Sequence, residues 1–532
     1  MIAKTTHLLS SVACASLLLV AGTAHADVTI SSAATSNMNC SAGVCTPTSS
    51  SAVLNAGDLE TLLASGNVMV TTTGSGVQAT NIVIDVAVSW SSTNAMTLDA
   101  YQSVAIDKRM TITGLGGLTL TTNDGGSGGG LFFGFNGSVQ FANLSSPLTI
   151  NGTSYALVGT VKGLAAAVAA NPAGAYALAA DFDAGRDGTY VSAPVATTLT
   201  GTFEGLGHAI SNLVIASMNS SSLGLFAQNA GTLRDIRMVD ASVTSPKSYT
   251  ELGAMVGGNA GIVQGCSSSG SIGSSAQPQG AANGGLVGYN SGTILLSHSS
   301  AAVWGDTYAG GLVGSNGGSI VQSSASGTVS GGIDSISGGL AGDNQGVIAF
   351  SFARGTTSGY YFAGGLVGLN TAGGRIEQSF ARGAVQAAQG VGGLVGDNDS
   401  GGAIAQSYST SDVSASYYEI GGLVGMNGNT GTVTEAYSTG YVAPPSGSRG
   451  GLIGLDSSTP GSLANTYWDR TTSKVPVRRQ GAGKPLNDQG ITGLSSKQLG
   501  AGLPAGFDPT VWGENASINK GFPYLIANPP VK

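Results

Sequence analysis

Short runs of alternating apolar and polar residues recur along most of the 532-residue chain and are separated by Gly, Asn or Ser. Alternation with a period of two predicts half-buried β-strands. Only Lys162 to Ala170 (KGLAAAVAA), which is followed by the breaker Asn171-Pro172, has the character of a short helix. We therefore expect an all-β chain in which this segment is the one short helix.

A repeated string, GGLVGxN, dominates the second half of the chain. Strict and looser copies together number nine, and successive copies are 26 to 31 residues apart. Their last residues are at positions 229, 259, 290, 316, 344, 370, 398, 427 and 456. A second string, Gly-x-Ile/Val-x-x-Ser-aromatic-x-x-Gly-x-Val, follows the copies, as in Gly374 to Val385 (GRIEQSFARGAV). Each period therefore holds three short β-prone runs.

Three short strands cannot bury an apolar face alone, so each repeat must stack on its neighbours. Parallel stacking at ~4.8 Å per coil predicts a right-handed parallel β-helix, a solenoid of about nine coils spanning roughly 40 Å. A propeller is the competing architecture, but its blades use about 40 residues each. The observed period is too short for a propeller.

The repeat also assigns roles to individual positions. Leu366 and Val367 should point into the core, whereas Ser358 should lie in an exposed loop. Cys266 takes the place of a recurrent serine, and His298 takes the place of a recurrent aromatic residue, so we expect packing and stacking roles for them. The recurrent asparagines suit a left-handed turn and a ladder of stacked amides. These structural anchors are Asn290, Asn316, Asn344, Asn370, Asn398 and Asn427.

Composition narrows the class of protein. Charged residues make up 9 % of the chain, where about 25 % is typical, and Ser, Thr, Asn and the 86 glycines supply most of the polarity. The net charge is −8 and no basic stripe exists, which argues against nucleic acid as a partner. No segment after the first 26 residues has the ~20 apolar residues of a membrane span.

Residues 1–26 are typical of an export signal. Lys4 supplies the positive charge, Leu8 to Val20 the apolar core, and Ala24-His25-Ala26 a cleavage site. Export leads to an oxidising compartment, where Cys40 and Cys45 either close a small disulfide loop or remain two unpaired thiols. The protein is expected to be secreted or held at the cell surface, with the periplasm as the other destination.

The remaining chain divides by composition. Residues 27–150 are expected to form a β-rich solenoid region with irregular coils. Residues 151–222 form a connector with the short helix and an entry coil, and residues 223–470 hold the repeats. Residues 471–532 carry much of the late Pro, Lys and Arg, and we expect them to fold back as a capping tail.

These strings resemble the GLUG motif of bacterial surface exoproteins and the adhesins that are similar to filamentous haemagglutinin. Further resemblance lies in an entry segment, two upstream strand modules and two closing segments: Gly201 to Ile215, Val88 to Ala100, Gly117 to Thr122, Tyr467-Trp468-Asp469 and Gly521 to Leu525. The resemblance covers nearly all of the mature chain. It implies presentation at a surface and attachment to a host or matrix glycan or surface protein. It does not specify one ligand.

Catalytic chemistry is sparse in the sequence. His208 and His298 are the only histidines after the signal, both lie in repeat-family positions, and the zinc motif H-E-x-x-H is absent. We therefore expect no enzyme activity, no metal and no cofactor. No terminal run of alternating barrel strands is evident, so export past an outer membrane would need a dedicated transporter as a partner.

The alternative is a β-helix enzyme that acts on polysaccharides, a lyase or a glycoside hydrolase, which needs clustered carboxylates. The candidates are Asp343, Asp397, Asp399 and Asp412. Asp343 and Asp397 both precede an anchor asparagine two coils apart, so stacking would separate them by roughly 10 Å along one edge. The sequence shows no apolar pocket that would raise their pKa, so solvated turn residues are the preferred interpretation.

One pattern of aromatic residues goes beyond the simple packing of the repeat and is compatible with binding. Aromatic residues precede the GG pair in alternate repeats, so their rings would lie ~9.6 Å apart along one edge. Such rings either seal the loops against the core or form a binding stripe for sugars or proteins. The stripe would consist of Tyr249, Trp304, Tyr308, Tyr361 and Tyr417.

Overall fold

A computed structural model describes residues 26–276, 280–444 and 447–530, so all but the last residue of the expected export signal lies outside the described residues. The fold is all-β with about 6 % helix, and its strands form a parallel β-solenoid of about 16 turns. The expectation of an all-β parallel solenoid is confirmed, but the count of nine coils was too low. Regular turns also form outside the repeats.

The chain divides into two compact units. The first comprises the residues up to Gly159 together with Ala175–Ala180 and Glu204–His208. The second, which we call the repeat unit, comprises Thr160–Gly174, Asp181–Phe203 and Ala209–Lys532. Each is described by itself below.

Each central coil of the repeat unit contains five short strands rather than three. One coil consists of β47 (Phe362–Gly364), β48 (Val367–Asn370), β49 (Arg375–Glu377), β50 (Phe380–Ala381) and β51 (Val385–Ala387). Two of the three predicted β-prone runs are each interrupted in the middle, so that each forms two short strands. In GGLVG the break is a tight corner, because a Cβ on the first glycine would lie 1.8 Å from the Val367 carbonyl oxygen. Only glycine fits there.

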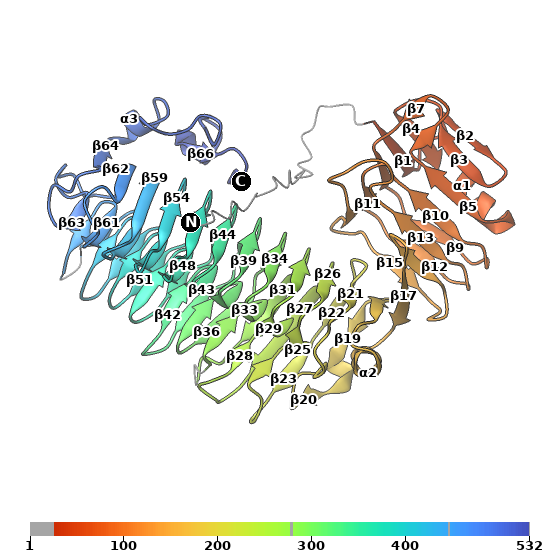
Figure 1. Cartoon of the computed structure of the whole chain (residues 1–532), viewed down its shortest axis with the longest axis horizontal. Coiled ribbons are helices and arrows are strands. Elements are labelled where there is room, and N and C mark those ends of the chain that lie inside the picture. The colour runs from red at the N-terminus through yellow and green to blue at the C-terminus, as the bar shows by residue number, and fades with distance from the viewer. Residues whose placement is uncertain (1–25, 277–279, 445–446, 531–532) are drawn as a thin grey trace, which may run out of the picture. The chain divides into compact units, whose positions relative to one another are not determined.

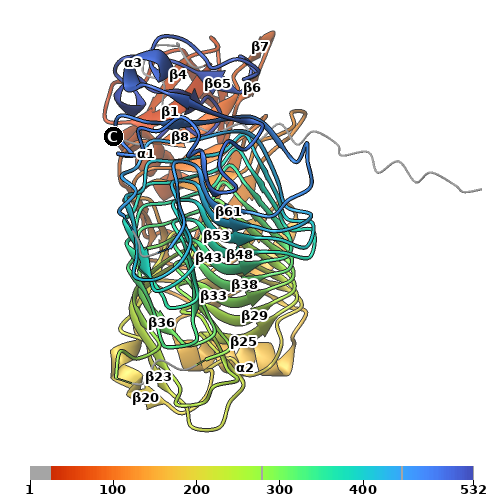
Figure 2. The same ribbon diagram turned by 90° about the vertical axis from the view of Figure 1, so that its left-hand side faces the viewer.

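The GxN strands form one ten-stranded parallel sheet, whose stacked members are visible in Figure 2. Successive anchor positions pair in register, for example Asn344 with Asn370 and Asn370 with Asn398. The sheet consists of β25 (Phe226–Asn229), β29 (Val256–Asn259), β33 (Val287–Asn290), β38 (Val313–Asn316), β43 (Ala341–Asn344), β48, β53 (Val395–Asn398), β58 (Val424–Asn427), β61 (Ile453–Asp456) and β63 (Ala482–Lys484).

A buried ladder of side-chain amides runs along this sheet. In every step from Asn229 to Asn427, the Nδ2 of one asparagine donates to the Oδ1 of the next at 2.7–2.8 Å. The last step ends on the carboxylate of Asp456, which accepts at 2.8 Å and has no amide to donate onward. All six predicted anchors are part of this ladder. Since such groups are costly to bury unpaired, the ladder fixes the register of the coils.

We expected the anchor asparagines to adopt the left-handed backbone conformation, but another position in the coil does so. It is the residue before the recurrent serine, as at Gln378 (φ 44°), whereas the anchor asparagines are not among the residues with positive φ. The corner is held by a second ladder, in which the Ser351 backbone N–H donates to Ser379 Oγ at 3.1 Å. Cys266 occupies the same buried corner, and its N–H donates to Ser297 Oγ at 3.2 Å.

The first unit is also built from parallel strands. One sheet has the order β14 (Leu131–Phe133), β11 (Val104–Ile106), β8 (Asn81–Ile84), β1 (Asp27–Ser31) and β4 (Ala52–Asn55). Its core is mainly aliphatic. An antiparallel hairpin of β2 (Met38–Ser41) and β3 (Val44–Pro47) is closed by a disulfide between Cys40 and Cys45.

The described residues form three α-helices, although only one short helix was expected. The expected helix is α2 (Val161–Ala170), which Thr160 caps through Gly163 N–H. The helix missed from the sequence is α1 (Ala56–Ser65), whose N-cap Asn55 accepts from the N–H groups of Gly57 and Asp58. Its Leu59 and Leu63 are buried one turn apart. A single turn, α3 (Ser496–Leu499), lies in the C-terminal segment.

The C-terminal segment of the repeat unit folds back on an aromatic stack. Phe352, Phe380, Tyr408 and Tyr437 lie on successive coils, with ring centroids 5.0–5.1 Å apart and nearly parallel planes. The ring of Trp512 packs on Tyr408 and Tyr437, and Asn528 Nδ2 donates to the carbonyl of Gln378. This segment therefore covers the stack along the side of the coils, as α3 and β66 (Tyr524–Leu525) show in Figure 1.

Candidate functional site

A polar column runs along the outside of the repeat unit. It lies on the strands β36 (Ala302–Gly305), β41 (Val329–Gly331), β46 (Thr357–Ser358), β51 and β56 (Val413–Ala415). Their pairing aligns Trp304 with Ser330, Ser358, Gln386 and Ser414. The preceding residues, including Val385 and Val413, are buried. Ser358 thus lies on a strand facing outward, not in an exposed loop as expected.

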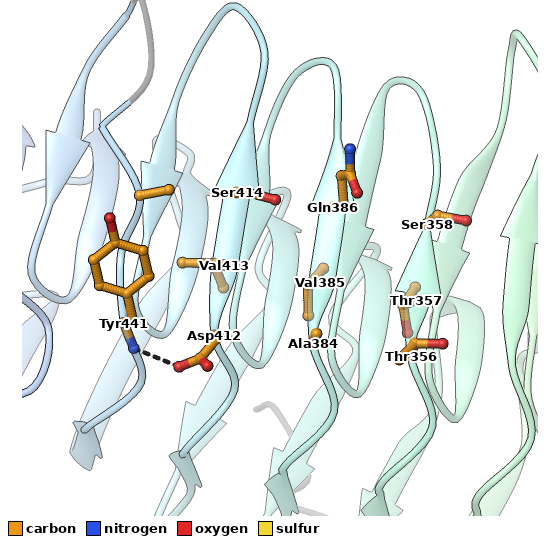
Figure 3. Close-up of a pocket in the computed structure, with 11 residues that line it drawn as sticks. Thr356, Thr357, Ser358, Ala384, Val385, Gln386, Asp412, Val413, Ser414 and Tyr441 are labelled. Carbon is orange, nitrogen blue, oxygen red and sulfur yellow. Dashed lines mark hydrogen bonds between the residues drawn. The ribbon is translucent and has the colours of Figure 1, made fainter.

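A shallow groove of about 430 Å³ crosses three of these coils (Figure 3). Hydroxyl, amide and carboxylate groups line it, including Thr356, Ser358, Gln386 and Asp412. At one end the carboxylate of Asp412 accepts the backbone N–H of Tyr441 at 2.8 Å. The Tyr441 ring is 41 % exposed and stands over this end of the groove. A ring beside a row of hydrogen-bonding groups suits an extended, hydroxyl-rich ligand.

A second recess of about 510 Å³ continues the groove, because Asp412 and Tyr441 line both. It adds the cationic side chains of Arg382 and Lys520. The Nη2 atom of Arg382 donates to Asn519 Oδ1 at 3.2 Å, and its guanidinium lies 5.6 Å above the Phe380 ring. The C-terminal segment therefore helps to build this recess. This recess was not predicted from the sequence, since residues 382 and 520 are far apart in the chain.

Exposed tyrosines are carried by the loops that follow two of the groove strands. Tyr361 is 38 % exposed and makes an edge contact with Tyr360, with centroids 5.2 Å apart. Tyr417 is 60 % exposed and lies 6.5 Å from the ring of Tyr418. Their exposure shows that these rings do not seal the core, and Tyr360 and Tyr417 are each two residues past the end of a groove strand, β46 or β56.

Four of the five rings of the expected stripe lie at or just before the start of strands in one nine-stranded sheet, and Trp304 lies in another sheet. Tyr249 is 89 % exposed and lies in the loop before β28 (Glu251–Leu252). Trp304 is half-buried in the outer column described above, whereas Tyr308 starts β37 (Tyr308–Gly310) in a different sheet and aligns with Ile336. Tyr361 and Tyr417 precede β47 and β57 (Ile420–Gly421), which belong to the same sheet as β37. Tyr249, Tyr361 and Tyr417 are exposed, whereas Trp304 and Tyr308 are half-buried, so the binding stripe stays a prediction.

The two carboxylates considered for catalysis share one column of the ten-stranded sheet. Asp343 pairs with Leu369, which pairs with Asp397, so the two aspartates are two coils apart as expected. They are not solvated turn residues, however. Burial raises the pKa of Asp343, and burial together with the Asp399 carboxylate raises the pKa of Asp397 to about 7. A burial-shifted carboxyl was not expected from the sequence.

His298 lies at the expected position but does not stack on a ring. Its strand neighbours are Ser267 and Ser324, and its imidazole nitrogens contact Ser324 Oγ at 2.9 Å and Ser326 Oγ at 3.2 Å. Burial and the nearby Arg354 lower the pKa of His298. The ring stack begins only two coils later, because Ser324 interrupts the aromatic column.

Metal sites and membrane spans are two other features of functional interest. Within residues 26–276, 280–444 and 447–530, no group of three or more His, Cys, Asp or Glu side chains is placed to hold a metal ion. Among the helices in these same ranges, none is both long enough and apolar enough to cross a bilayer.

Comparisons with known proteins add little. No protein-family profile matches the sequence. Halomucin of Haloquadratum walsbyi is 31 % identical over 143 residues, which is 24 % of this chain and only 2 % of the length of halomucin. A solved structure of a putative immunoglobulin A1 protease from Bacteroides ovatus covers 70 % of this chain and 93 % of its own, with 16 % identity and a TM-score of 0.27. A TM-score of 0.27 is too low to support a conclusion about the function of this chain.

Proposed function

We propose that this chain is an exported, non-catalytic attachment protein, a right-handed GLUG-type β-helix that binds glycan or protein surfaces. The observation that carries the proposal is the polar groove across three coils, together with exposed tyrosine pairs in the loops that follow two of the groove strands. Stacked coils present similar groups in a line, so weak contacts add through multivalency. The ladders stabilise the coils, which leaves the outer column available for contact.

The resemblance to haemagglutinin-like adhesins supports the same proposal. It implies secretion or retention at the cell surface, with a dedicated outer-membrane transporter as a partner in export. Fractionating cells with an antibody against the repeat unit checks this destination. Recovery in the medium or on intact cells supports the proposal, and recovery only inside the periplasm contradicts it.

The binding test uses the purified mature chain on arrayed glycans and on intact cells. The variant Tyr361→Ser/Tyr417→Ser/Tyr418→Ser removes exposed rings, and Tyr308 is left intact because it is half-buried. We expect binding to weaken by roughly tenfold or more, since the loss of even one interface tyrosine that acts as a hot spot costs about 1–2 kcal/mol. The melting temperature should change little. Tyr289→Ser is the matched control, because Tyr289 is also 38 % exposed but lies on another sheet.

A polysaccharide-acting enzyme is the second candidate function. Asp343 and Asp397 favour it, because a carboxyl with a pKa near 7 can act as a general acid at neutral pH. The almost complete burial of Asp343 opposes it, since a substrate could not reach that carboxylate. Incubation with polysaccharides followed by reducing-end analysis distinguishes the two functions. Turnover that Asp397→Asn abolishes would establish the enzyme and defeat the attachment proposal.

A further inference from the structure

Two arginines lie side by side on adjacent coils of the repeat unit. Arg354 follows β45 (Phe352–Ala353) and Arg382 follows β50, and the Arg382 backbone N–H donates to the carbonyl of Ala353 at 3.0 Å. The two positions are therefore separated by about one strand spacing, ~4.8 Å. Like charges opposite each other on neighbouring strands are destabilising. Such a pair is unexpected in a chain with only 20 Lys and Arg residues and a net charge of −8.

Aromatic rings orient both guanidinium groups. Arg354 lies 5.1 Å above the centroid of Phe352, and Arg382 lies 5.6 Å above that of Phe380. The two rings are themselves stacked in nearly parallel planes. A guanidinium gains cation–π attraction from a ring beneath it, and its planar fork of N–H groups suits a planar anion. The stack thus places two guanidinium groups over rings of successive coils, and that of Arg382 also donates one N–H to Asn519.

A third cation and the polar groove adjoin this pair. Lys520 is exposed and lines the same recess as Arg382. The acidic group of that recess is Asp412, whose Oδ1 already accepts the N–H of Tyr441. On the other side of the pair, burial and the Arg354 charge lower the pKa of His298, so its imidazole is neutral near pH 7 and adds no charge. The recess therefore has a cationic side that continues into the hydroxyl-lined groove of Figure 3.

We propose that Arg354, Arg382 and Lys520 bind the carboxylates of an acidic polysaccharide whose chain crosses the coils along the groove. This inference rests on the proposed attachment function and names its ligand class. Guanidinium groups bind carboxylates through two parallel hydrogen bonds, and the groove offers Ser, Thr and Gln side chains to sugar hydroxyls. An extended glycan also repeats its charged groups, which suits cations repeated from coil to coil.

The test measures equilibrium binding of the mature protein to polygalacturonate and to its methyl ester, which has the same backbone without the charge. We expect the ester to bind at least about tenfold more weakly, because charge-assisted hydrogen bonds are lost. Arg354→Gln and Lys520→Gln should each weaken binding of polygalacturonate several-fold and leave binding of the ester unchanged. Arg375→Gln is the control, because Arg375 already pairs with Glu377.

Arg382→Gln is interpreted only together with its melting temperature, because Arg382 also holds Asn519 of the C-terminal segment. Equal binding of polygalacturonate and its ester, or arginine variants that bind like the wild type, would overturn the inference. Tighter binding of dextran sulfate, weakened by the same variants, would assign the cations to sulfate instead of carboxylate. If none of these polymers binds but cells do, only this inference fails. If nothing binds, the attachment function fails with it.

Discussion

The two units of this chain build parallel coils by different means. The first unit has a core of large aliphatic side chains such as Ile30, Leu54 and Ile82. The repeat unit adds buried polar ladders, in which each anchor asparagine hydrogen bonds to the next coil. Aliphatic burial is non-directional, so it tolerates irregular coils. Directional hydrogen bonds do not, which explains why the repeats keep similar lengths and one register.

The largest effect is expected from a charge placed in the repeat core. Leu366→Asp or Val367→Asp would bury an uncompensated carboxylate at a position with no solvent exposure, at a cost of several kcal/mol. The central coils should unfold, which circular dichroism and urea titration would detect. Ser358→Asp on the outer face should cost little. Equal tolerance of both changes would show that the side-chain register is wrong.

Breaking the amide ladder should have the next largest effect. Asn370→Ala removes the acceptor of Asn344 and the donor to Asn398, and each buried group left unpaired costs about 1–3 kcal/mol. The exposed Asn429 offers a control, Asn429→Ala. The free energy of unfolding from urea titration measures both. A loss no larger than in the control would mean that the ladder accompanies the fold without fixing it.

A smaller effect should appear as a dependence on pH. The pKa of Asp397 is raised from 3.8 to about 7, so the folded state favours the protonated carboxyl. Its contribution is therefore fully present below about pH 4 and is lost as the pH rises through 7. The variant Asp397→Asn should lose less stability between pH 4 and pH 8 than the wild type. Melting curves that remain parallel across this range would contradict the buried position of Asp397.

The repeated strings predicted the stacking and the anchor positions because each string places the same residue at the same point of every coil. They could not show that Gln378 takes the left-handed corner or that GGLVG is broken by a tight corner between β47 and β48. Those features depend on how closely backbones approach, as at Gly364. α1 was missed because its two buried leucines lie within only ten residues.

The candidate site was less predictable than the fold. The groove is formed by residues at equivalent positions of three stacked coils. The cationic recess also needs Lys520, which is 138 positions after Arg382 in the sequence. Spacing within the repeat grouped Tyr361 and Tyr417 with Tyr308, and all three lie at or before the start of strands in one sheet, but it did not show that Tyr308 is half-buried. These sites depend on contacts between segments that are distant in the sequence, and the repeat period does not predict such contacts.

Hydrogen exchange of the mature protein, with and without a bound polysaccharide or cell-wall fragment, tests most directly whether the repeat unit carries the binding site. The account predicts slower exchange in β46, β51 and β56 and in the tyrosine loops at 359–361 and 416–418. The first unit should exchange as it does without ligand. Protection confined to the first unit, in a sample where binding is demonstrated, would contradict the account.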